Sequence, residues 1–522
     1  MVAEEVRGKG KRGLLRIIFG RTTFFILFMA LQIAVLAWIY FWLDDRYQAY
    51  GYGAFGLVSA VLAIRILNEK QNASFKMAWL VPVLLFPVFG CLFYIFVQLQ
   101  MEKRIADIRI RTRSYLKQNE AIAAKLMKEN RRNANLSRYL SERAGYPVYD
   151  RTNFKYYPLG DDFFPDLLEE LKAAERFIFL EYFIIQRGEM WDSVLKILEE
   201  KAAAGVDVRV LYDGMNSFSN LPHDYPKELE ARGVRCRIFN PIRPAISTSQ
   251  NNRDHRKILV IDGHTAFTGG VNLADEYINR KVRFGHWKDN AVRLKGEAVK
   301  SFTVMFLQMW SVCAFRPEYD FDYGPFLDTG DHFHSPALNM DGYSIPFSDS
   351  PLDGEPVGHQ VYLDIIYQAR RYVYIMTPYL ILDSEMITAL TRAAKSGIEV
   401  IIIMPHIPDK WYAFVLAHTY YKELIQAGVS IYEYTPGFVH AKVFVSDDDT
   451  ATVGTINLDY RSLHLHFECA AYLFRNQAVA QAEADFQDTL KKSQEITVED
   501  CRNYPLGRRM AGKMLRLIAP LM

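Results

Sequence analysis

Cysteine is scarce in this sequence and shows no pairing pattern. The 522 residues contain five cysteines, an odd number, at wide spacings and without a CxxC pair. This pattern excludes a disulfide-stapled scaffold and gives no sign of a zinc site built on cysteine. We therefore expect free thiols, several of them buried. They are Cys91, Cys236, Cys313, Cys469 and Cys501.

An excess of charge of one sign is also missing. The chain has 62 basic and 60 acidic residues, which gives a formal net charge of +2. A nuclease or another nucleic-acid-binding enzyme typically carries a basic surface with exposed aromatic side chains. The charge balance disfavours that class, so we expect no nucleic-acid partner.

Long apolar runs are present, and they gather in the first hundred residues. Thr22–Leu43 and Met77–Met101 are uncharged and long enough for membrane-spanning helices, whereas Tyr47–Ile64 would span the bilayer or lie at its interface. The first run is too long for a signal-peptide core and lacks a small-x-small cleavage site. We therefore predict that residues 1–104 are an N-terminal membrane module with two or three hydrophobic segments. The protein would be an integral, multi-pass protein of the cell membrane.

Basic clusters flank this module on both sides, between Arg7 and Arg16 and between Lys103 and Arg113. The positive-inside rule places both clusters in the cytoplasm. With two spans both clusters lie in the cytoplasm, and with three spans they do not. Charge alone does not decide the number of spans or the side of the membrane on which the catalytic part lies. Residues 105–144 are predicted to be a basic helical linker.

The remaining chain reads as two copies of one α/β unit. Short β-rich apolar runs alternate with helical patterns, and the same order occurs twice. This predicts a first repeat at 145–315 and a second at 347–504. The linker at 316–346 is rich in Pro, Gly and Asp.

Four polar positions recur at one offset between the two copies. The later residue follows the earlier one by 185 positions in each of these pairs: His255 and His440, Lys257 and Lys442, Asp262 and Asp447, Asn272 and Asn457. A single HxKxxxxD match carries little weight. Two matches in register, each followed by Asn-Leu at the same distance, indicate an internal duplication.

The duplicated motif suits phosphodiester exchange. Strand alternation places His255 and Lys257 on one face, and His440 and Lys442 likewise, so two facing half-sites form one symmetric pocket. The lysines neutralise the nonbridging oxygens. One neutral histidine attacks phosphorus, and the other, protonated, gives its proton to the leaving alcohol. A second alcohol then attacks the phosphohistidine, so that one alcohol replaces another.

Further polar residues complete the predicted site. Asn272 and Asn457 would donate hydrogen bonds to the phosphate. Asp289 and Glu468 follow the two motifs at roughly comparable positions, and each would hold a histidine in one tautomer; the alternative is a surface carboxylate.

The aspartates of the motif, Asp262 and Asp447, belong to the predicted catalytic set and either orient the rings or anchor turns. The exchange conserves bond type, so it needs no nucleotide. Lysine two residues after each histidine would oppose a cation, and no helical HxxxH is present. We predict no metal at these residues and no cofactor.

The motifs also carry a family resemblance. Two HxKxxxxD motifs followed by GGxNL and GTxNLDxRS resemble the phospholipase D superfamily. Gly454–Glu468, Ala78–Tyr94, Gly285–Gly296 and Ile431–Lys442 resemble bacterial cardiolipin synthases in particular. The resemblance extends over nearly the whole chain from about residue 52.

This resemblance implies that two phosphatidylglycerols give cardiolipin and glycerol, with phosphatidylglycerol and membrane lipids as partners. It implies a pseudo-twofold fold of mixed sheets flanked by helices, with the site between the repeats. In such enzymes the first-repeat histidine is usually the nucleophile, which would assign nucleophilic attack to His255 and acid–base catalysis to His440. The membrane module of such enzymes usually looks like two segments, and Tyr52–Leu67 and Met77–Gln98 match them in this sequence. Thr22–Leu43 is therefore an extra hydrophobic segment.

Other functions remain open on the sequence. Water as acceptor would give a phospholipase D-type hydrolase, and a different alcohol would give another transphosphatidylase. A non-catalytic scaffold is disfavoured because both motifs are intact. A route through a CDP-activated lipid would need DGxxAR, and neither Asp213-Gly214 nor Asp262-Gly263 is followed by Ala-Arg. The sequence does not define the oligomeric state.

Two segments outside the motifs have alternative interpretations. Residues 505–522 are predicted to be a basic amphipathic helix, which would either lie on anionic lipid or dock on the second repeat. Trp411–Tyr421 is either an aromatic loop that gates the pocket or an amphipathic helix.

Overall fold

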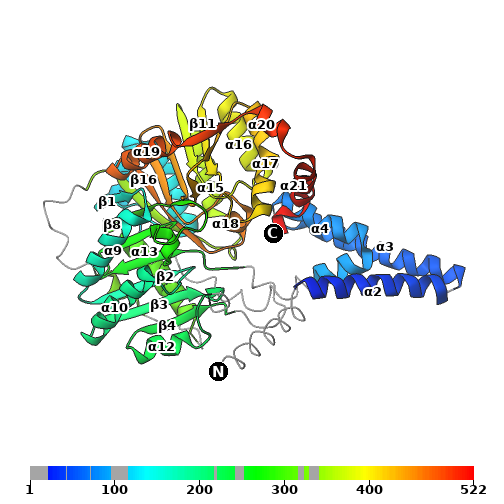
Figure 1. The fold of residues 1–522 in the computed structure, drawn as a ribbon, viewed down its shortest axis with the longest axis horizontal. Helices are drawn as coiled ribbons and strands as arrows, with labels where there is room; N and C mark the ends of the chain where they lie inside the picture. Colours follow the sequence, from blue (N-terminus) through cyan, green and yellow to red (C-terminus); the bar gives the residue numbers. More distant parts are fainter. Residues whose placement is uncertain are drawn as a thin grey trace. The chain divides into compact units, whose positions relative to one another are not determined.

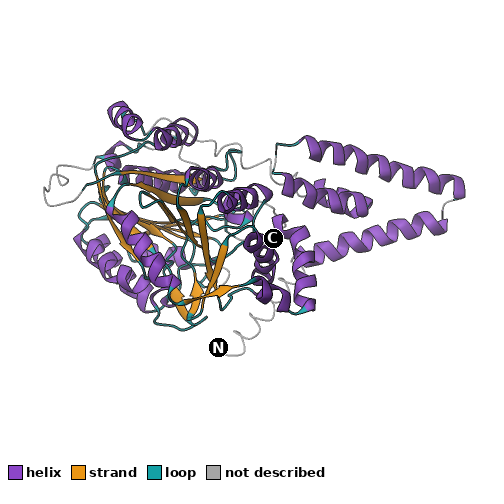
Figure 2. Cartoon of the chain, turned by 90° about the horizontal axis from the view of Figure 1, so that it is seen from above, coloured by secondary structure: helices purple, strands orange, loops and turns teal. Residues whose placement is uncertain are grey.

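The computed structural model describes residues 21–42, 44–70, 72–95, 116–216, 220–241, 252–314, 322–328 and 340–521. Both basic clusters that flank the predicted membrane module lie outside these ranges, as does the end of the run from Met77 to Met101. The chain forms two compact units, a small one made mainly of the first 108 residues and a large one comprising Arg109–Pro241 and Asn252–Arg516. The described part of the small unit is helical, and the strands belong to the large unit (Figure 1, Figure 2).

The small unit contains helices α2 (Arg21–Trp42), α3 (Asp45–Asn68) and α4 (Ala73–Leu85), followed by helical residues 87–95. A buried apolar core joins α3 to the two later helical segments; its members are Leu62, Ala63, Ile66, Trp79, Leu80, Val83, Cys91 and Tyr94. The hydroxyl of Ser59 on α3 also donates to the carbonyl of Val83, at 2.9 Å. The described parts of the apolar runs are therefore helical, as predicted.

The third apolar run is interrupted at Phe86. This residue has φ −128° and ψ 73°, outside the helical region, and α4 ends there. Pro87 follows it, and a proline disfavours the α conformation of the residue before it while lacking an N–H of its own. Proline therefore divides the predicted single span into two shorter helical pieces.

One helix in the described part of the chain, Ala49–Asn68, is long and apolar enough to cross a membrane. Met29–Trp42 and Ala73–Leu85 are shorter apolar helices. Large apolar side chains on these helices are exposed, among them Trp38, Phe41, Val61, Ile64 and Leu85. An exposed apolar surface of this kind fits contact with lipid or another apolar partner. The helix best suited to cross a membrane therefore overlaps Tyr47–Ile64, the run for which the sequence also allowed an interfacial position.

The first repeat forms a seven-stranded mixed sheet of order β1-β8-β6-β5-β2-β3-β4. Its strands β2, β3 and β4 pair in parallel, and the other pairs are antiparallel. The strands are β1 Thr152–Tyr157, β2 Phe177–Tyr182, β3 Asp207–Asp213, β4 Arg235–Phe239, β5 Lys257–Ile261, β6 Thr265–Gly269 and β8 Ala291–Gly296.

The second repeat reproduces this order as β9-β16-β15-β14-β10-β11-β12 and adds β17 at the edge. The duplication predicted from the 185-residue offset is thus visible as one topology used twice. The strands are β9 Tyr343–Asp349, β10 Tyr372–Met376, β11 Glu399–Pro405, β12 Ser430–Tyr434, β14 Val443–Ser446, β15 Thr450–Gly454, β16 Glu468–Phe474 and β17 Ser493–Ile496.

Helices cover both sheets, as predicted. In the first repeat they are α9 Gly160–Ala173, α10 Glu189–Ala203, α12 Tyr225–Ala231 and α13 Val299–Val312. In the second they are α15 Val357–Gln368, α16 Ser384–Lys395, α17 Trp411–Gln426, α18 Tyr460–His464, α19 Gln477–Leu490 and α20 Val498–Asn503. Helix α13 packs on its own sheet and on β9, and α19 packs on its own sheet and on β1. Helices α13 and α19 therefore each also support the other repeat.

The helix-to-strand turns are also repeated. Gly205 after α10 has φ +91°, and Gly397 after α16 has φ +87°. Glycine is the residue that adopts this left-handed conformation readily at a helix end. Each turn leads directly into a buried parallel strand, β3 or β11, so the two crossover units have the same local design.

Two boundaries differ from the sequence prediction. Strand β9 begins at Tyr343, inside the predicted linker 316–346, because residues 343–346 pair with β16. The segment 105–144 contains helices α7 (Glu120–Glu129) and α8 (Arg131–Tyr139), followed by a π-helical turn. Tyr139 Oη donates to Glu355 at 2.6 Å. This segment is therefore packed on the second repeat and is more than a connector.

The helices bear on two predicted alternatives. Trp411–Tyr421 lies within α17, so it is a helix. The C-terminal segment forms α21 (Leu506–Ile518), which docks on α17: Gly512 packs against Val415 and Thr419, where a Cβ would lie 2.6 Å from the threonine methyl. Leu506, Met510 and Met514 form an exposed apolar stripe on α21, so one helix has a docking face and a free apolar face.

A buried ion pair joins the repeats. Lys288 Nζ lies 2.8 Å from Asp485 Oδ2 on α19, and both side chains are almost fully buried. The Asp485→Asn variant leaves a buried ammonium without its counter-charge and should lower the unfolding free energy by about 3 kcal/mol. Thermal or chemical unfolding in detergent would measure the loss. Asp488→Asn, on the same helix but in an exposed pair with Lys491, is the control and should change nothing measurable. Equal stability of the two variants would contradict the prediction.

Candidate active site

Short segments of each repeat pair with the other repeat and set the site. Strand β7 (His286–Lys288) runs parallel to β13 (Gly437–Val439), with Lys288 opposite Val439. A second parallel bridge joins Asp254 to Phe467. One residue beyond the first pairing lie Asp289 and His440, and one residue beyond the second lie His255 and Glu468. The register between the repeats therefore brings each histidine to a carboxylate of the other repeat.

The two histidine–carboxylate pairs are short. His255 Nδ1 lies 2.9 Å from each carboxylate oxygen of Glu468. His440 Nδ1 lies 2.6 Å from Asp289 Oδ2. Both carboxylates are fully buried. The suggestion that these acids hold the histidines agrees with the contacts, and the surface alternative for Asp289 is wrong.

The second residue of the GGxNL turn, Gly270, and of the GTxNL turn, Thr455, lies beside a buried carboxylate in each case. A Cβ at Gly270 would lie 1.9 Å from Asp289 Oδ1, so only glycine leaves room for this aspartate. The equivalent Thr455, 185 residues later, instead donates its hydroxyl to Glu468. The small sequence difference between the two turns thus matches the different acids.

Aromatic side chains enclose the two imidazoles. Phe183 lies edge-to-face against His255, with ring centroids 5.0 Å apart. Tyr277 and Trp287 each lie 5.4 Å from the ring of His440. Apolar walls of this kind limit water around the reacting atoms and strengthen electrostatic interactions within the site.

Each lysine of the motif lies beside its histidine. Lys257 Nζ donates to the carbonyl of His255 at 2.5 Å, and Lys442 Nζ donates to the carbonyl of His440. Burial lowers the pKa of Lys257 to about 8 and the pKa of Lys442 to about 7. A phosphate anion placed between the ammonium groups would favour their charged forms.

Burial favours the neutral form of both histidines in the free site. Burial lowers the pKa of His255 to about 3 and that of His440 to about 4, and these effects outweigh the nearby carboxylates. With Nδ1–H donated to the acid, the lone pair resides on Nε2, which is the nitrogen available to attack phosphorus or accept a proton.

The two histidines precede the strands. Strand β5 begins at Lys257 and β14 at Val443, so His255 and His440 are not strand residues as the sequence suggested. The backbone N–H of His255 bonds to Phe467, and that of His440 bonds to Lys288, each in the other repeat. Pairing between repeats replaces pairing within the sheet at these positions.

The motif aspartates have a different position from the histidines. The carboxylate of Asp262 accepts the backbone N–H groups of residues 175–177 at 2.7–2.8 Å. That of Asp447 accepts those of residues 370–372 at 2.8–3.2 Å. They adopt positive φ angles, 53° and 56°. Of the two roles left open by the sequence, these contacts favour turn anchoring, and we remove both residues from the catalytic set.

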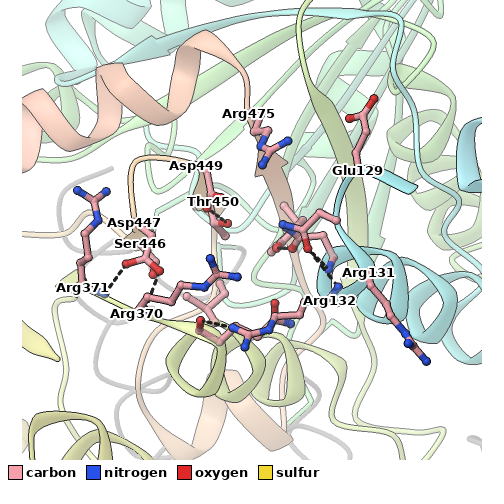
Figure 3. A pocket seen from close by; sticks show the side chains of 15 residues that line it. Glu129, Arg131, Arg132, Arg370, Arg371, Ser446, Asp447, Asp449, Thr450 and Arg475 are labelled. Atoms are coloured by element: carbon pink, nitrogen blue, oxygen red, sulfur yellow. Dashed lines mark hydrogen bonds between the residues drawn. The ribbon is translucent and has the colours of Figure 1, made fainter. Parts of the chain in front are cut away.

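Figure 3 shows Asp447 beside Arg370 and Arg371, in a pocket of about 660 Å³. The pocket is also lined by Arg131, Arg132 and other polar residues. Asp447 follows the last residue of β14, whereas His440 precedes the first. The pocket therefore lies at the strand end away from the histidine and is separate from it.

The anchoring role of Asp447 predicts a stability effect. The Asp447→Asn variant keeps a residue that tolerates the left-handed backbone but loses charged acceptors for three N–H groups. We expect the unfolding free energy to fall by about 1–2 kcal/mol, with unchanged activity per folded molecule. Unfolding curves and initial rates would test this. Asp448→Asn, at the exposed neighbour, serves as the control. A specific loss of turnover at normal stability would return Asp447 to the catalytic set.

The two asparagines of the motif differ. Asn272 Oδ1 accepts from the N–H of Ile184 at 3.0 Å, and its Nδ2 donates to Tyr277 Oη at 2.8 Å. It therefore positions Tyr277, which packs on His440. The buried Oδ1 of Asn457 has no hydrogen-bond partner among the described residues. This oxygen can only accept, so donation from Asn457 to the phosphate stays a prediction.

The sequence prediction omitted one side chain of the site, His466. Its ring lies 5.7 Å from the ring of His255, and its Nδ1 lies 3.8 Å from Glu468 Oε1. Both of its ring nitrogens are buried without a hydrogen-bond partner in the described part of the chain. The alternation of His466 and Glu468 was the available signal, because residues two apart share a side of an extended segment.

Two similar sheets with duplicated histidine–lysine half-sites at their junction are the architecture of the phospholipase D superfamily. The family described as cardiolipin synthase, PLD-like domain, matches residues 167–310 and 362–490. The family described as phospholipase D-nuclease N-terminal matches residues 57–98. The chain belongs to the cardiolipin synthase family.

Similar proteins cover most of the chain. It is 34% identical to cardiolipin synthase 2 of Bacillus anthracis over 467 residues, 88% of each chain. It is 34% identical to the cardiolipin synthase of Geobacillus kaustophilus over 469 residues, 88% of this chain and 91% of that one. An uncharacterized protein of Streptococcus mutans is 49% identical over 462 residues, 88% of this chain and 98% of the relative.

Among solved structures, the phosphatidylserine synthase of Haemophilus influenzae is similar in fold. It has a TM-score of 0.55 and 15% sequence identity, over 76% of this chain and 100% of that chain. This likeness concerns the fold of the paired repeats.

All five cysteines lie in the described part of the chain and are free thiols, three of them buried.

Proposed function

We propose that this protein is a cardiolipin synthase, which transfers a phosphatidyl group from one phosphatidylglycerol to another and releases glycerol. The observation that carries the proposal is the crossed pairing of His255 with Glu468 and of His440 with Asp289. Two acid-supported imidazoles with buried lysines beside them can perform attack and proton transfer on one phosphodiester.

In the first half-reaction, Nε2 of His255 attacks phosphorus and the bond to the glycerol oxygen breaks. The bound phosphodiester anion favours the protonated form of His440, which gives its proton to that oxygen, and glycerol leaves. Glu468 stabilises the positive charge that develops on His255. Lys257 and Lys442 stabilise the phosphoryl oxygens in the transition state.

In the second half-reaction, a glycerol hydroxyl of another phosphatidylglycerol attacks the phosphatidyl-His255. His440, now neutral, accepts the hydroxyl proton, and the phosphorus–nitrogen bond breaks. Cardiolipin forms, and both histidines return to their starting protonation states. One phosphodiester is broken and one is made, so no nucleotide enters the reaction. Asp289 holds His440 in the orientation that serves both steps.

The helical N-terminal unit supports a lipid substrate. Its exposed apolar side chains and the candidate span Ala49–Asn68 would keep the enzyme at the membrane, where both lipids are present. We propose an integral protein of the cell membrane with more than one membrane-inserted helix. The aromatic walls around the imidazoles favour an alcohol acceptor over water.

The test is reconstitution of the purified full chain in phosphatidylglycerol vesicles without added metal or nucleotide. Cardiolipin and glycerol in equal amounts are the expected products. Phosphatidic acid with glycerol would identify water as acceptor and make the protein a phospholipase. Absence of product would refute phosphatidylglycerol as a sufficient substrate. Mixed vesicles with other alcohol headgroups would then identify the acceptor.

The lysine pKa values predict an alkaline limit for catalysis. As pH rises through about 7 to 8, Lys442 and then Lys257 lose their charges in the free enzyme. Attraction for the phosphodiester falls with them, so kcat/KM should decrease with rising pH. In an active Lys442→Arg variant, the decrease of kcat/KM should begin at a higher pH, since arginine stays charged. A flat pH profile up to about pH 9 would contradict this assignment.

A further inference from the structure

A second cluster of histidine and carboxylate side chains lies in the second repeat and shares no residue with the pairs formed by His255 and His440. It joins His359 on α15, Asp383 at the N-cap of α16 and His464 at the end of α18. Nε2 of His359 lies 3.2 Å from Asp383 Oδ2, and Nε2 of His464 lies 3.5 Å from the same oxygen. The side chains of His359 and Asp383 are 1% exposed, and that of His464 is 12% exposed.

These separations match the ligand spacing of a metal ion. Tetrahedral zinc bound at 2.0–2.1 Å holds its ligand atoms about 3.3 Å apart. Each of the two nitrogens already lies near that spacing from the oxygen of Asp383. Asp383 Oδ1 accepts the backbone N–H of Met386 at 2.9 Å, which fixes the carboxylate and directs Oδ2 to both imidazoles.

A further carboxylate lies near the other ring nitrogen of His359. Its Nδ1 lies 3.9 Å from Glu385 Oε2, beyond hydrogen-bond distance, so the exposed Glu385 side chain would have to move closer to accept from it. Donation of the second ring N–H to a carboxylate fixes the tautomer and leaves the other nitrogen for the metal. Here that other nitrogen is Nε2, on the side of Asp383 and within the cluster.

The buried Nε2 of His359 also lacks a satisfying partner. Its 3.2 Å contact with Asp383 does not have hydrogen-bond geometry, and no other partner is present among the described residues. A buried polar atom without a partner is costly, and such atoms often mark a missing ion or water. A cation between the three side chains would satisfy it.

We propose that His359, Asp383 and His464 bind one Zn²⁺, with water in the fourth position. The ion would tie together α15, the start of α16 and the end of α18. Helix α18 leads within four residues to Glu468, the acid that holds His255. The site would therefore stabilise the wall of the catalytic pocket and take no part in phosphoryl transfer.

The test measures metal on the full chain in detergent, after removal of metal with a chelator and dialysis against zinc. We expect about one zinc per chain. Co²⁺ in its place should give the visible absorption of a tetrahedral ion with nitrogen and oxygen ligands. His359→Gln and His464→Gln should each weaken zinc binding at least tenfold and abolish the rise in Tm that zinc gives the wild type.

Two further histidine variants serve as controls. His406→Gln changes a half-exposed histidine paired with Glu433 and should keep full binding. Two groups of described residues have metal-ligand spacing: His359 with Asp383 and Glu385, and His255 with His466 and Glu468. His466→Gln tests the second group. Loss of zinc in His466→Gln with retention in His359→Gln would overturn the proposal, as would a wild type that binds neither zinc nor cobalt.

Metal binding and the Co²⁺ spectrum of the wild type are measured without activity, so they stand apart from the proposed reaction. If a glutamine variant fails to fold, the spectrum of the wild type and its zinc-dependent Tm still decide whether the chain holds a tetrahedral ion. Asp383→Asn then provides the third variant, because its Oδ1 position can still accept from Met386.

Discussion

Alanine at His255 or at His440 is expected to reduce cardiolipin formation by about 10³–10⁴-fold. His255→Ala removes the atom that bonds to phosphorus, and His440→Ala removes the group that moves protons to and from both alcohols. Initial rates in phosphatidylglycerol vesicles would measure the loss. His264→Ala is the matched control: this histidine lies at the turn after β5, where its Nδ1 contacts Thr265.

The His255→Ala and His440→Ala variants also distinguish the nucleophile from the acid–base group. A covalent phosphatidyl adduct should form on His440→Ala, because its nucleophile is intact, and none should form on His255→Ala. Mass spectrometry after rapid quenching would detect it. An adduct on His440 in the His255→Ala variant would reverse the assignment. Normal turnover by either variant would eliminate the two-histidine mechanism.

Replacing Glu468 by glutamine is expected to reduce kcat by about 10²–10³-fold with little change in KM. The carboxylate contacts His255 and not the lipid in the proposed reaction, so it acts by orienting the imidazole and stabilising its positive charge. Its charge also raises the pKa of His255 against the effect of burial. Glutamine removes this support and makes the nucleophile less basic.

A comparable loss is expected for Asp289→Asn through His440. Glu433→Gln is the control, since it also removes a buried glutamate paired with a histidine, His406, at another place in the second repeat. Steady-state kinetics on mixed micelles would separate kcat from KM. A rise in KM with unchanged kcat would show that Glu468 binds substrate instead of positioning His255.

The repeated part of the fold was readable from the sequence because its signals are local. Each motif lies on a strand–turn–strand unit whose apolar pattern spans about twenty residues, and the 185-residue offset aligns these units. The break at Phe86 was also present in the sequence as Pro87, although the apolar run alone suggested one span.

The partners of the histidines were harder to predict because they depend on contacts between repeats. Glu468 follows Asp289 by 179 residues, which departs from the offset of the other pairs. Nothing local shows that each acid serves the histidine of the other copy, since that depends on the register of β7 with β13 and of Asp254 with Phe467. The roles of Asp262 and Asn272 likewise depend on distant backbone groups that they bind.

The crossed carboxylates have a consequence for how such a protein can have evolved. A single repeat carries a histidine without its acid and an acid without its histidine, so it is inert alone. An ancestral half-length chain would have gained its chemistry only by association with a second copy, which supplies both missing partners at once. Fusion of two such genes would make that association permanent and let the two halves diverge, which fits Gly270 beside aspartate and Thr455 beside glutamate.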